Sequence, residues 1–287
     1  MTTAARRPVV AGQFYPGEAA ALTKQIEQCF LDARGPGELP TRRRSNSRSL
    51  IAAVVPHAGY EYSGAIAAHV YAQVARERPP ESVLVLGVDH HGASEGPSIS
   101  RRPWSTPLGP MANDAALADA LDRPPVRTDE AAHAYEHSIE VQLPFLEYVL
   151  PHPRFVPLQV PFGPLDYLRS VGEVVRAATR GRDVLLLAST DFSHYVPAET
   201  ARRLDHLAID AILARDAARL YETVAKHDIS MCGIAPTTVL LSALSDRPLS
   251  TRLFRYGHSG EVVRMRDVVG YAAIALDAPP AAPAPVK

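Results

Sequence analysis

The chain has 287 residues, of which 46% are hydrophobic and 21% are charged, with 30 lysines and arginines against 31 aspartates and glutamates. This composition is typical of a globular domain and excludes a disordered chain and a coiled coil. A net charge of −1 gives no electrostatic reason to expect nucleic acid or a membrane as a partner.

Short apolar runs alternate with helical patterns along the chain. Continuous apolar runs predict buried strands, whereas apolar residues spaced three and four apart predict helices. The expected helices are Glu18–Ala33, Ser63–Arg76, Asp114–Leu121, Ser138–Leu150, Leu165–Thr179, Glu199–Ala214, Ala217–Ala225 and Ile234–Leu244. The expected strands are Leu50–Val55, Ser82–Val88, Arg154–Val160, Asp183–Ala188, Leu249–Tyr256 and Asp267–Leu276. Pro144 should kink or shorten the helix that contains it.

This alternation predicts an α/β fold, a single three-layer domain with a mostly parallel central sheet flanked by helices. We expect the domain to span residues 1–277 and the Pro/Ala-rich residues 278–287 to form a disordered tail. The segment Thr41–Ser49, with four arginines and three serines, predicts an exposed loop. Two cysteines are too few for a disulfide framework, and no signal peptide is recognisable, so we expect a cytoplasmic protein.

Histidines follow three of the predicted buried strands. His57 follows the strand at 50–55, His90 and His91 follow the strand at 82–88, and His194 follows the strand at 183–188. In an open α/β sheet, ligands bind beyond the carboxyl ends of the strands. One such histidine would more often be structural, but three predict a shared site at this edge.

Cys232 lies just before the predicted helix that starts at Ile234. The positive end of a helix dipole favours the thiolate, which is the form that binds metals or attacks electrophiles. A small buried apolar residue is the alternative for Cys232, and both interpretations stay open here. Cys29 fits the apolar role, because it lies on the apolar face of the first predicted helix.

The segment from Glu136 to Glu140 holds a further cluster at the start of a predicted helix. Glu140 would share a helix face with His137, three residues earlier. Carboxylates favour the first turn of a helix, so these residues could simply stabilise it. Equally, they could orient a metal ligand or a substrate.

Several common site patterns are missing from the sequence. It contains no GxGxxG, GxxxxGK[ST], HExxH or CxxC motif. Residues 92–96 match GxSxG, but Pro97 follows where a nucleophile elbow needs a helix. Dinucleotide binding, P-loop chemistry, an α/β-hydrolase site and the common zinc sites are therefore disfavoured.

The candidate site that remains consists of Asp191, Cys232 and the histidines that follow the strands, His57, His90 and His194. Two imidazoles and a thiolate with open positions suit Fe(II), Cu or Zn. A thiolate in place of the carboxylate of a non-haem iron site favours iron or copper with redox chemistry. In this interpretation His194 is an acid or base, and Asp191 is its neighbour or supports a ligand.

Six motifs resemble, in order, those of the MEMO family, also called AmmeMemoRadiSam system protein B. They are VAGQFYP (residues 10–16), PHAGY (56–60), His90-His91, EHSIE (136–140), DFSHY (191–195) and Cys232-Gly233. The resemblance covers the chain from about Arg7 to Leu276.

The resemblance implies a fold similar to class III extradiol dioxygenases of the LigB type, with metal ligands at His57, His90 and Cys232. It implies that Asp191 and His194 are further pocket residues, with His194 as the acid or base. Residues expected to support the ligands or contact substrate are His137, Glu140, Tyr60 and His91. The family is associated with iron or copper and with AMMECR-type and radical SAM proteins.

The function we expect is that of a metal-dependent redox enzyme resembling the extradiol dioxygenases. Its metal would be Fe(II) first, Cu second and Zn last, and its substrate a small molecule or a peptide-borne aromatic group. The main alternative is a non-catalytic metal- or peptide-binding module with a vestigial dioxygenase pocket. A zinc-dependent hydrolase is a third possibility, without a base motif to support it.

Overall fold

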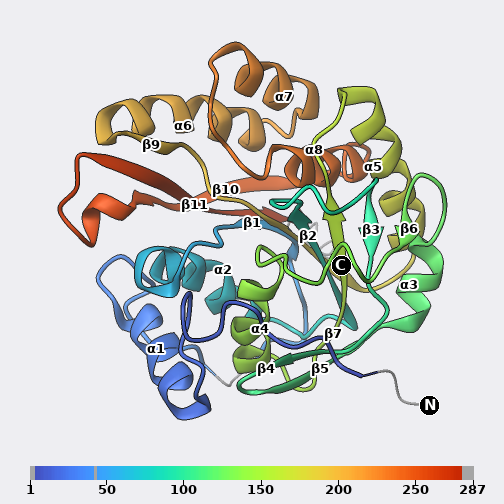
Figure 1. Cartoon of the computed structure of the whole chain (residues 1–287), viewed down its shortest axis with the longest axis horizontal. Helices are drawn as coiled ribbons and strands as arrows, with labels where there is room; N and C mark the ends of the chain where they lie inside the picture. Colours follow the sequence, from blue (N-terminus) through green and yellow to red (C-terminus); the bar gives the residue numbers. More distant parts are fainter. Residues whose placement is uncertain (1–3, 42–43, 280–287) are drawn as a thin grey trace, which may run out of the picture.

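The apolar runs of the sequence form the centre of a mixed sheet in the computed structural model, which describes residues 4–41 and 44–279. The strands are β1 (Leu50–Val55), β2 (Ser82–Val88), β3 (Ser98–Ile99), β4 (Trp104–Thr106), β5 (Gly109–Asn113), β6 (Arg127–Thr128), β7 (Arg154–Val160), β8 (Val184–Ser189), β9 (His194–Pro197), β10 (Ser250–His258) and β11 (Asp267–Asp277). Their main order is β10-β11-β1-β8-β2-β7-β3-β6 (Figure 1). The central neighbours β1, β8, β2 and β7 are parallel, and β10 and β11 are antiparallel.

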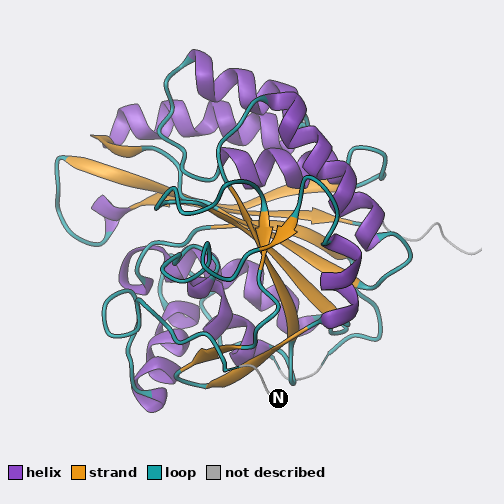
Figure 2. Cartoon of the chain, turned by 45° about the vertical axis from the view of Figure 1, so that its right-hand side comes forward, coloured by secondary structure: helices purple, strands orange, loops and turns teal. Residues whose placement is uncertain are grey.

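Helices cover both faces of this sheet (Figure 2). They are α1 (Ala19–Leu31), α2 (Ala65–Arg76), α3 (Ala115–Leu121), α4 (Leu143–Val149), α5 (Leu165–Thr179), α6 (Ala198–Leu213), α7 (Ala217–Lys226) and α8 (Ile234–Ala243). Three single turns complete the set: η1 (Tyr60–Gly64), η2 (Glu140–Gln142) and η3 (Ser259–Glu261). Helices α1, α2 and α4 pack on one face, and α3 and α5 to α8 pack on the other.

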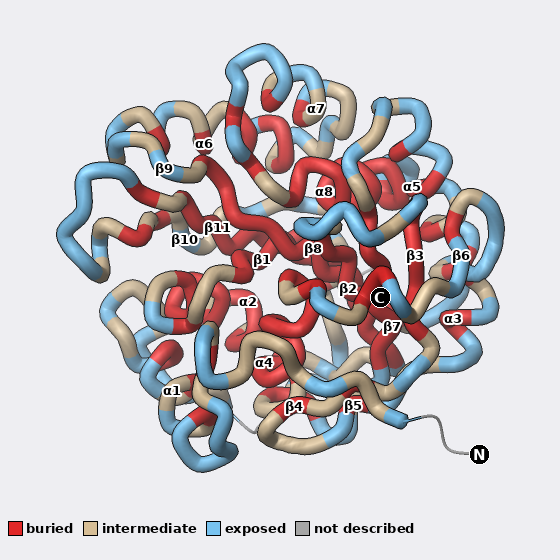
Figure 3. Tube along the Cα trace, in the orientation of Figure 1, coloured by how far each residue is buried: buried red, intermediate tan, exposed pale blue. Residues whose placement is uncertain are grey.

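Successive strand residues supply the two cores alternately, as the period of a β-strand requires. In β8, Leu186 belongs to the core under α5 to α8, whereas Leu185 and Leu187 belong to the core under α1, α2 and α4. The central strands are buried on both faces (Figure 3), which explains why they appear in the sequence as unbroken apolar runs. The predicted three-layer α/β domain is confirmed.

The main differences from the predicted elements are local. Helix α4 begins at Leu143 with Pro144 in its first turn, so the predicted helix 138–150 is shortened rather than kinked. Proline suits a first turn because its missing N–H would have no partner there. The short strands β3 to β6 and β9 were not predicted, because pieces of two to five residues carry no periodicity.

The arginine-rich loop is largely exposed, as predicted, but two of its arginines are anchored to the fold. Arg48 pairs with Asp183 and donates to the Leu50 carbonyl, and Arg44 donates to the Val149 carbonyl. These contacts bury much of both guanidinium groups. Residues 42–43 of the loop, and residues 280–287 of the predicted tail, lie outside the described residues. Among the helices of the described ranges, none combines the length and apolarity that crossing a membrane requires.

The sheet order brings three loops together at one edge. Strand β8 lies between β1 and β2, with Ser189 in register with Val55 and Ala188 with Leu86. Because the three strands are parallel, their carboxyl ends meet at this edge. The loops that carry His57, His90 and Asp191 therefore start side by side.

Gly270 in β11 holds the loop after β8. It accepts a hydrogen bond from the Phe192 amide at 2.8 Å and donates to the Ser193 carbonyl at 2.9 Å. A Cβ atom at this position would lie 1.9 Å from Oδ2 of the buried Asp205. The position therefore excludes any side chain.

We expect Gly270→Ala to lower the free energy of unfolding by about 2 kcal/mol or more, because the carboxylate would have to leave its partners. Urea unfolding measures this. Gly17→Ala is the control, since a Cβ atom there meets nothing closer than 3.7 Å. Equal stability of the two variants would contradict the close approach.

Candidate metal centre

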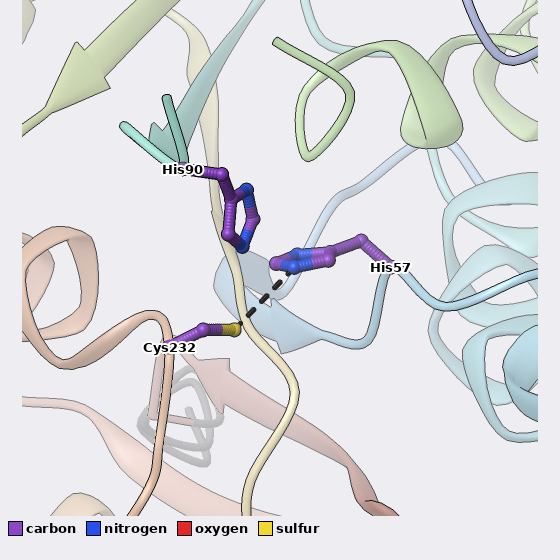
Figure 4. Close-up of side chains that lie close together, drawn as sticks. All are labelled: His57, His90 and Cys232. Carbon is purple, nitrogen blue, oxygen red and sulfur yellow. Dashed lines mark hydrogen bonds between the residues drawn. The ribbon is translucent and has the colours of Figure 1, made fainter. Parts of the chain in front are cut away.

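Three side chains at this edge direct ligand atoms toward one point. His57, His90 and Cys232 each offer one atom, and these atoms all lie within 4.8 Å of one another (Figure 4). His57 Nε2 is 3.4 Å from Cys232 Sγ, and the two imidazole rings are 5.3 Å apart and nearly perpendicular. They come from the loop after β1, the loop after β2 and the approach to α8.

His57 is held at both its backbone and its ring. Its amide donates to Asp191 Oδ1 at 2.8 Å, and its Nδ1 lies 3.0 Å from Ser189 Oγ. The residue is only 2% exposed. Burial, with the neighbouring His137 and His90, lowers the pKa of His57 well below its ordinary value. The imidazole is therefore neutral, which is the state that binds a metal.

His90 is oriented by the buried carboxylate of Glu136. Its Nδ1 lies 2.9 Å from Glu136 Oε1, and its amide donates to Oε2 at 2.8 Å. Burial tends to raise the pKa of Glu136, but the hydrogen bonds from His90 and Ser138 and the interaction with the His90 ring hold it well below its usual range. An ionised carboxylate only accepts hydrogen bonds, so Nδ1 carries a proton and Nε2 is the nitrogen left to bind a metal.

Cys232 is fixed by the backbone of the loop after β8. The Asp191 amide donates to Cys232 Sγ at 3.2 Å, and the Gly233 amide donates to Thr190 Oγ1 at 2.9 Å. A Cβ atom on Gly233 would lie 2.2 Å from the Thr190 side chain, so only glycine allows this approach.

In the absence of a cation, the surroundings of Cys232 favour the thiol over the thiolate. Cys232 precedes the N-cap Gly233 and is half-buried. Burial, together with the Asp191 carboxylate, raises the pKa of the Cys232 thiol. Desolvation disfavours the thiolate, and a bound cation is the partner that would stabilise it.

Asp191 connects His57, from the loop after β1, with Cys232, which precedes α8. Its carboxylate accepts from the His57 amide, and its own amide reaches the Cys232 sulfur. Burial raises the pKa of Asp191 to about 6, although the hydrogen bond from His57 acts in the opposite direction.

His137 lies directly beside the ligand group. Its ring stacks on His90 at 4.5 Å and meets Phe14 edge-on at 5.0 Å. Burial lowers the pKa of His137 to about 4, so its ring is neutral at physiological pH. His90, Glu136 and His137 form a second possible ligand group, but the Glu136 oxygens already accept hydrogen bonds from His90 and Ser138.

His194 lies outside the group of three ligand atoms. It begins β9, and its Nδ1 lies 2.8 Å from the Ser230 carbonyl while its amide donates to Ser230 Oγ. Because a carbonyl only accepts, Nδ1 carries the proton and Nε2 is free to take one. The residue is half-buried, so this nitrogen can meet solvent or a substrate.

Three other residues named from the sequence contact different parts of the fold. The Tyr60 hydroxyl donates to the Val141 carbonyl inside the core, and exposed His91 bonds to the Tyr135 carbonyl. The Glu140 carboxylate pairs with Arg6 at 2.8 Å. The structure does not bring these residues to the ligand atoms.

The contacts by which Glu136 and Ser189 support the histidine ligands were not predicted from the sequence. The sequence predicts Glu136 only as one member of the 136–140 cluster, without a named partner, and Ser189 only as the residue after a strand. The available signal for Ser189 was a lone hydroxyl at the end of an otherwise apolar strand, next to the predicted site. No spacing rule links Glu136 to His90, because the contact crosses 46 positions of sequence.

Comparison with known proteins agrees with this arrangement of motifs. The model of the Memo-like protein family matches residues 6–275. The chain belongs to this family. A MEMO1 family protein of Methanopyrus kandleri is 42% identical over 94% of this chain and 98% of its own length. A similar protein of Methanococcus maripaludis is 39% identical over 94% of this chain and 99% of its own length. One of Methanosarcina barkeri is 40% identical over 95% of this chain and 100% of its own length.

The donors of this Memo-like chain fit a transition metal chemically. Two imidazoles and one sulfur form a mixed set of borderline and soft ligands, which suits Fe(II), Cu or Zn better than Mg²⁺ or Ca²⁺. The Nδ1 atoms of His57 and His90 both have hydrogen-bond partners, which leaves Nε2 for a metal. This is the usual arrangement of metal-binding histidines.

We expect Glu136→Gln to weaken metal binding by about 10- to 100-fold, because the amide cannot replace both carboxylate oxygens around His90. Competition with a chromophoric chelator measures the affinity.

Glu130→Gln is the matched control. Glu130 also accepts a backbone amide, from Arg101 at 2.8 Å, but does not contact the ligand residues. Equal metal affinity of the two variants would remove Glu136 from the support of the site.

Proposed function

We propose that this protein binds one transition metal ion through His57 Nε2, His90 Nε2 and Cys232 Sγ and acts as a redox enzyme. The observation that carries the proposal is the convergence of the three donor atoms within 4.8 Å. Three protein ligands leave further coordination positions for substrate, which is the pattern of catalytic rather than structural sites.

Iron is the metal we expect first, copper second and zinc last. Bound iron or copper would supply Lewis acidity and electron transfer, as metals do in the extradiol dioxygenases, whose fold the family resemblance implies. A thiolate among the ligands favours these redox metals. Both cysteines are free, and a reducing cytoplasm would keep Cys232 available as a ligand.

His194 is our candidate for the acid or base. Its Nδ1–H is engaged by the Ser230 carbonyl, so Nε2 can take a proton from a bound substrate and return it. Asp191 holds the His57 backbone and the Cys232 sulfur in place. The rings of His137 and Phe14 beside the ligands offer a wall for a small-molecule or peptide-borne aromatic substrate.

A metal- or peptide-binding module without turnover is the second candidate. The exposed ring of Tyr195, next to His194, and the exposed ring of Tyr135, whose carbonyl contacts His91, favour it. Such rings are common anchors in protein interfaces. The AMMECR-type and radical SAM proteins implied by the family resemblance would be tested first as partners.

After anaerobic reconstitution with Fe(II), we expect about one metal ion per chain in the wild-type protein and less than about a tenth of that in His57→Ala and Cys232→Ala, since each substitution removes a ligand. Elemental analysis measures the content. Cys29→Ala, which changes the cysteine buried against α2 and η1, should keep full occupancy. Full metal content in the two ligand variants would overturn the ligand assignment.

We expect His194→Ala to keep the metal and to lose about 10²- to 10⁴-fold in oxygen uptake with an aromatic substrate, the usual contribution of a general acid or base. Oxygen-electrode rates and metal content are measured on the same samples. Uptake that is unchanged in the variant would contradict the role of His194. Binding of substrate or peptide without any turnover in the wild-type protein would support the second candidate.

A further inference from the structure

Ser189 occupies the centre of a buried hydrogen-bond network behind His57. Its hydroxyl oxygen has three neighbours: the Ser138 carbonyl at 2.7 Å, Gln142 Nε2 at 2.7 Å and His57 Nδ1 at 3.0 Å. A hydroxyl has one proton to donate and two lone pairs to accept. The three contacts therefore use its whole capacity.

The direction of each bond follows from groups that can act in only one way. The Ser138 carbonyl only accepts, so it takes the Ser189 proton. The Pro56 carbonyl also only accepts, and it lies 2.9 Å from Gln142 Nε2, which identifies that end of the amide as the NH₂ group. The Tyr71 hydroxyl donates to the opposite oxygen of Gln142 at 2.6 Å, in agreement with this orientation.

With its proton given to Ser138 and one lone pair facing the Gln142 NH₂ group, Ser189 can only accept from His57. Nδ1 of His57 must then carry the proton, and Nε2 must carry the lone pair. That lone pair lies on the side of Cys232 Sγ, 3.4 Å away. A neutral imidazole has no other way to satisfy these contacts.

We propose that Ser189 is a positioning residue that holds His57 in its Nδ1–H tautomer and so presets Nε2 as a metal ligand. The proposal rests on the proposed metal site. Ser138 and Gln142 determine the direction in which the Ser189 hydroxyl points.

The two ligand histidines are thus held in the same tautomer by different acceptors. A carboxylate, Glu136, faces His90, whereas a neutral hydroxyl faces His57. An ionised acceptor makes the imidazole a stronger donor to a metal than a neutral one does. No charged acceptor faces His57, so its tautomer depends on the direction of the neutral hydrogen bonds around Ser189.

The first test uses metal-free wild-type protein, so it does not depend on metal binding or activity. Long-range ¹H–¹⁵N correlation spectra distinguish the protonated and unprotonated nitrogens of each imidazole. We expect His57 as a single Nδ1–H tautomer at neutral pH. A His57 signal with the proton on Nε2 would overturn the proposal.

The second test compares Ser189→Ala with Ser193→Ala. The Ser193 hydroxyl is also buried at this edge but faces Asp205 rather than His57, so its loss should leave the His57 spectrum and the metal affinity unchanged. In Ser189→Ala we expect both tautomers or the Nε2–H form, and metal binding weakened by about tenfold or more. Ser189→Thr, which keeps the hydroxyl, should restore the wild-type spectrum if the variant folds.

A single Nδ1–H tautomer in Ser189→Ala would overturn the role of Ser189 even if the protein binds metal normally. Conversely, a wild-type protein with the expected tautomer that fails to bind Fe(II), Cu or Zn would overturn the proposed function and leave the tautomer assignment standing. The two failures are therefore distinguishable in the same set of samples.

Discussion

The hydrogen bonds of one buried segment, residues 136–142, fix the geometry of both histidine ligands. Glu136 holds His90 through its ring and its backbone, and Ser138 and Gln142 act on His57 through Ser189. A polar network in a low-dielectric interior is rigid when every member is satisfied. The imidazoles can therefore face Cys232 without being held by a metal.

The segment is itself held by Arg6. The guanidinium donates to the Glu136 carbonyl at 2.6 Å, to the His133 carbonyl at 2.7 Å and to Glu140, and it lies 3.9 Å above the ring of Trp104. Glu140 is fully buried, and its carboxylate also accepts hydrogen bonds from the Val9 and Val10 amides and the Tyr15 hydroxyl. The N-terminal segment is thus part of the support of the site.

Much of the fold could be predicted because its central strands are buried on both faces. β1, β2 and β7 have the predicted limits, and the strand-end rule brings His57 and His90 to one edge, where Cys232 joins them. Side-chain partners could not be predicted in the same way. The sequence offers Glu140 as a possible site residue, but its carboxylate pairs with Arg6. The two residues lie 134 positions apart, so no local pattern predicts the pair. The partial burial of Cys232 likewise depends on tertiary packing.

X-ray absorption at the metal edge of the zinc-loaded protein tests most directly whether His57, His90 and Cys232 share one ion. The account predicts one sulfur neighbour at about 2.3 Å and nitrogen neighbours at about 2.0–2.1 Å, with imidazole scattering from two histidines. In Cys232→Ser the sulfur shell should disappear. A wild-type spectrum without sulfur, or an unchanged sulfur shell in Cys232→Ser, would contradict the shared site.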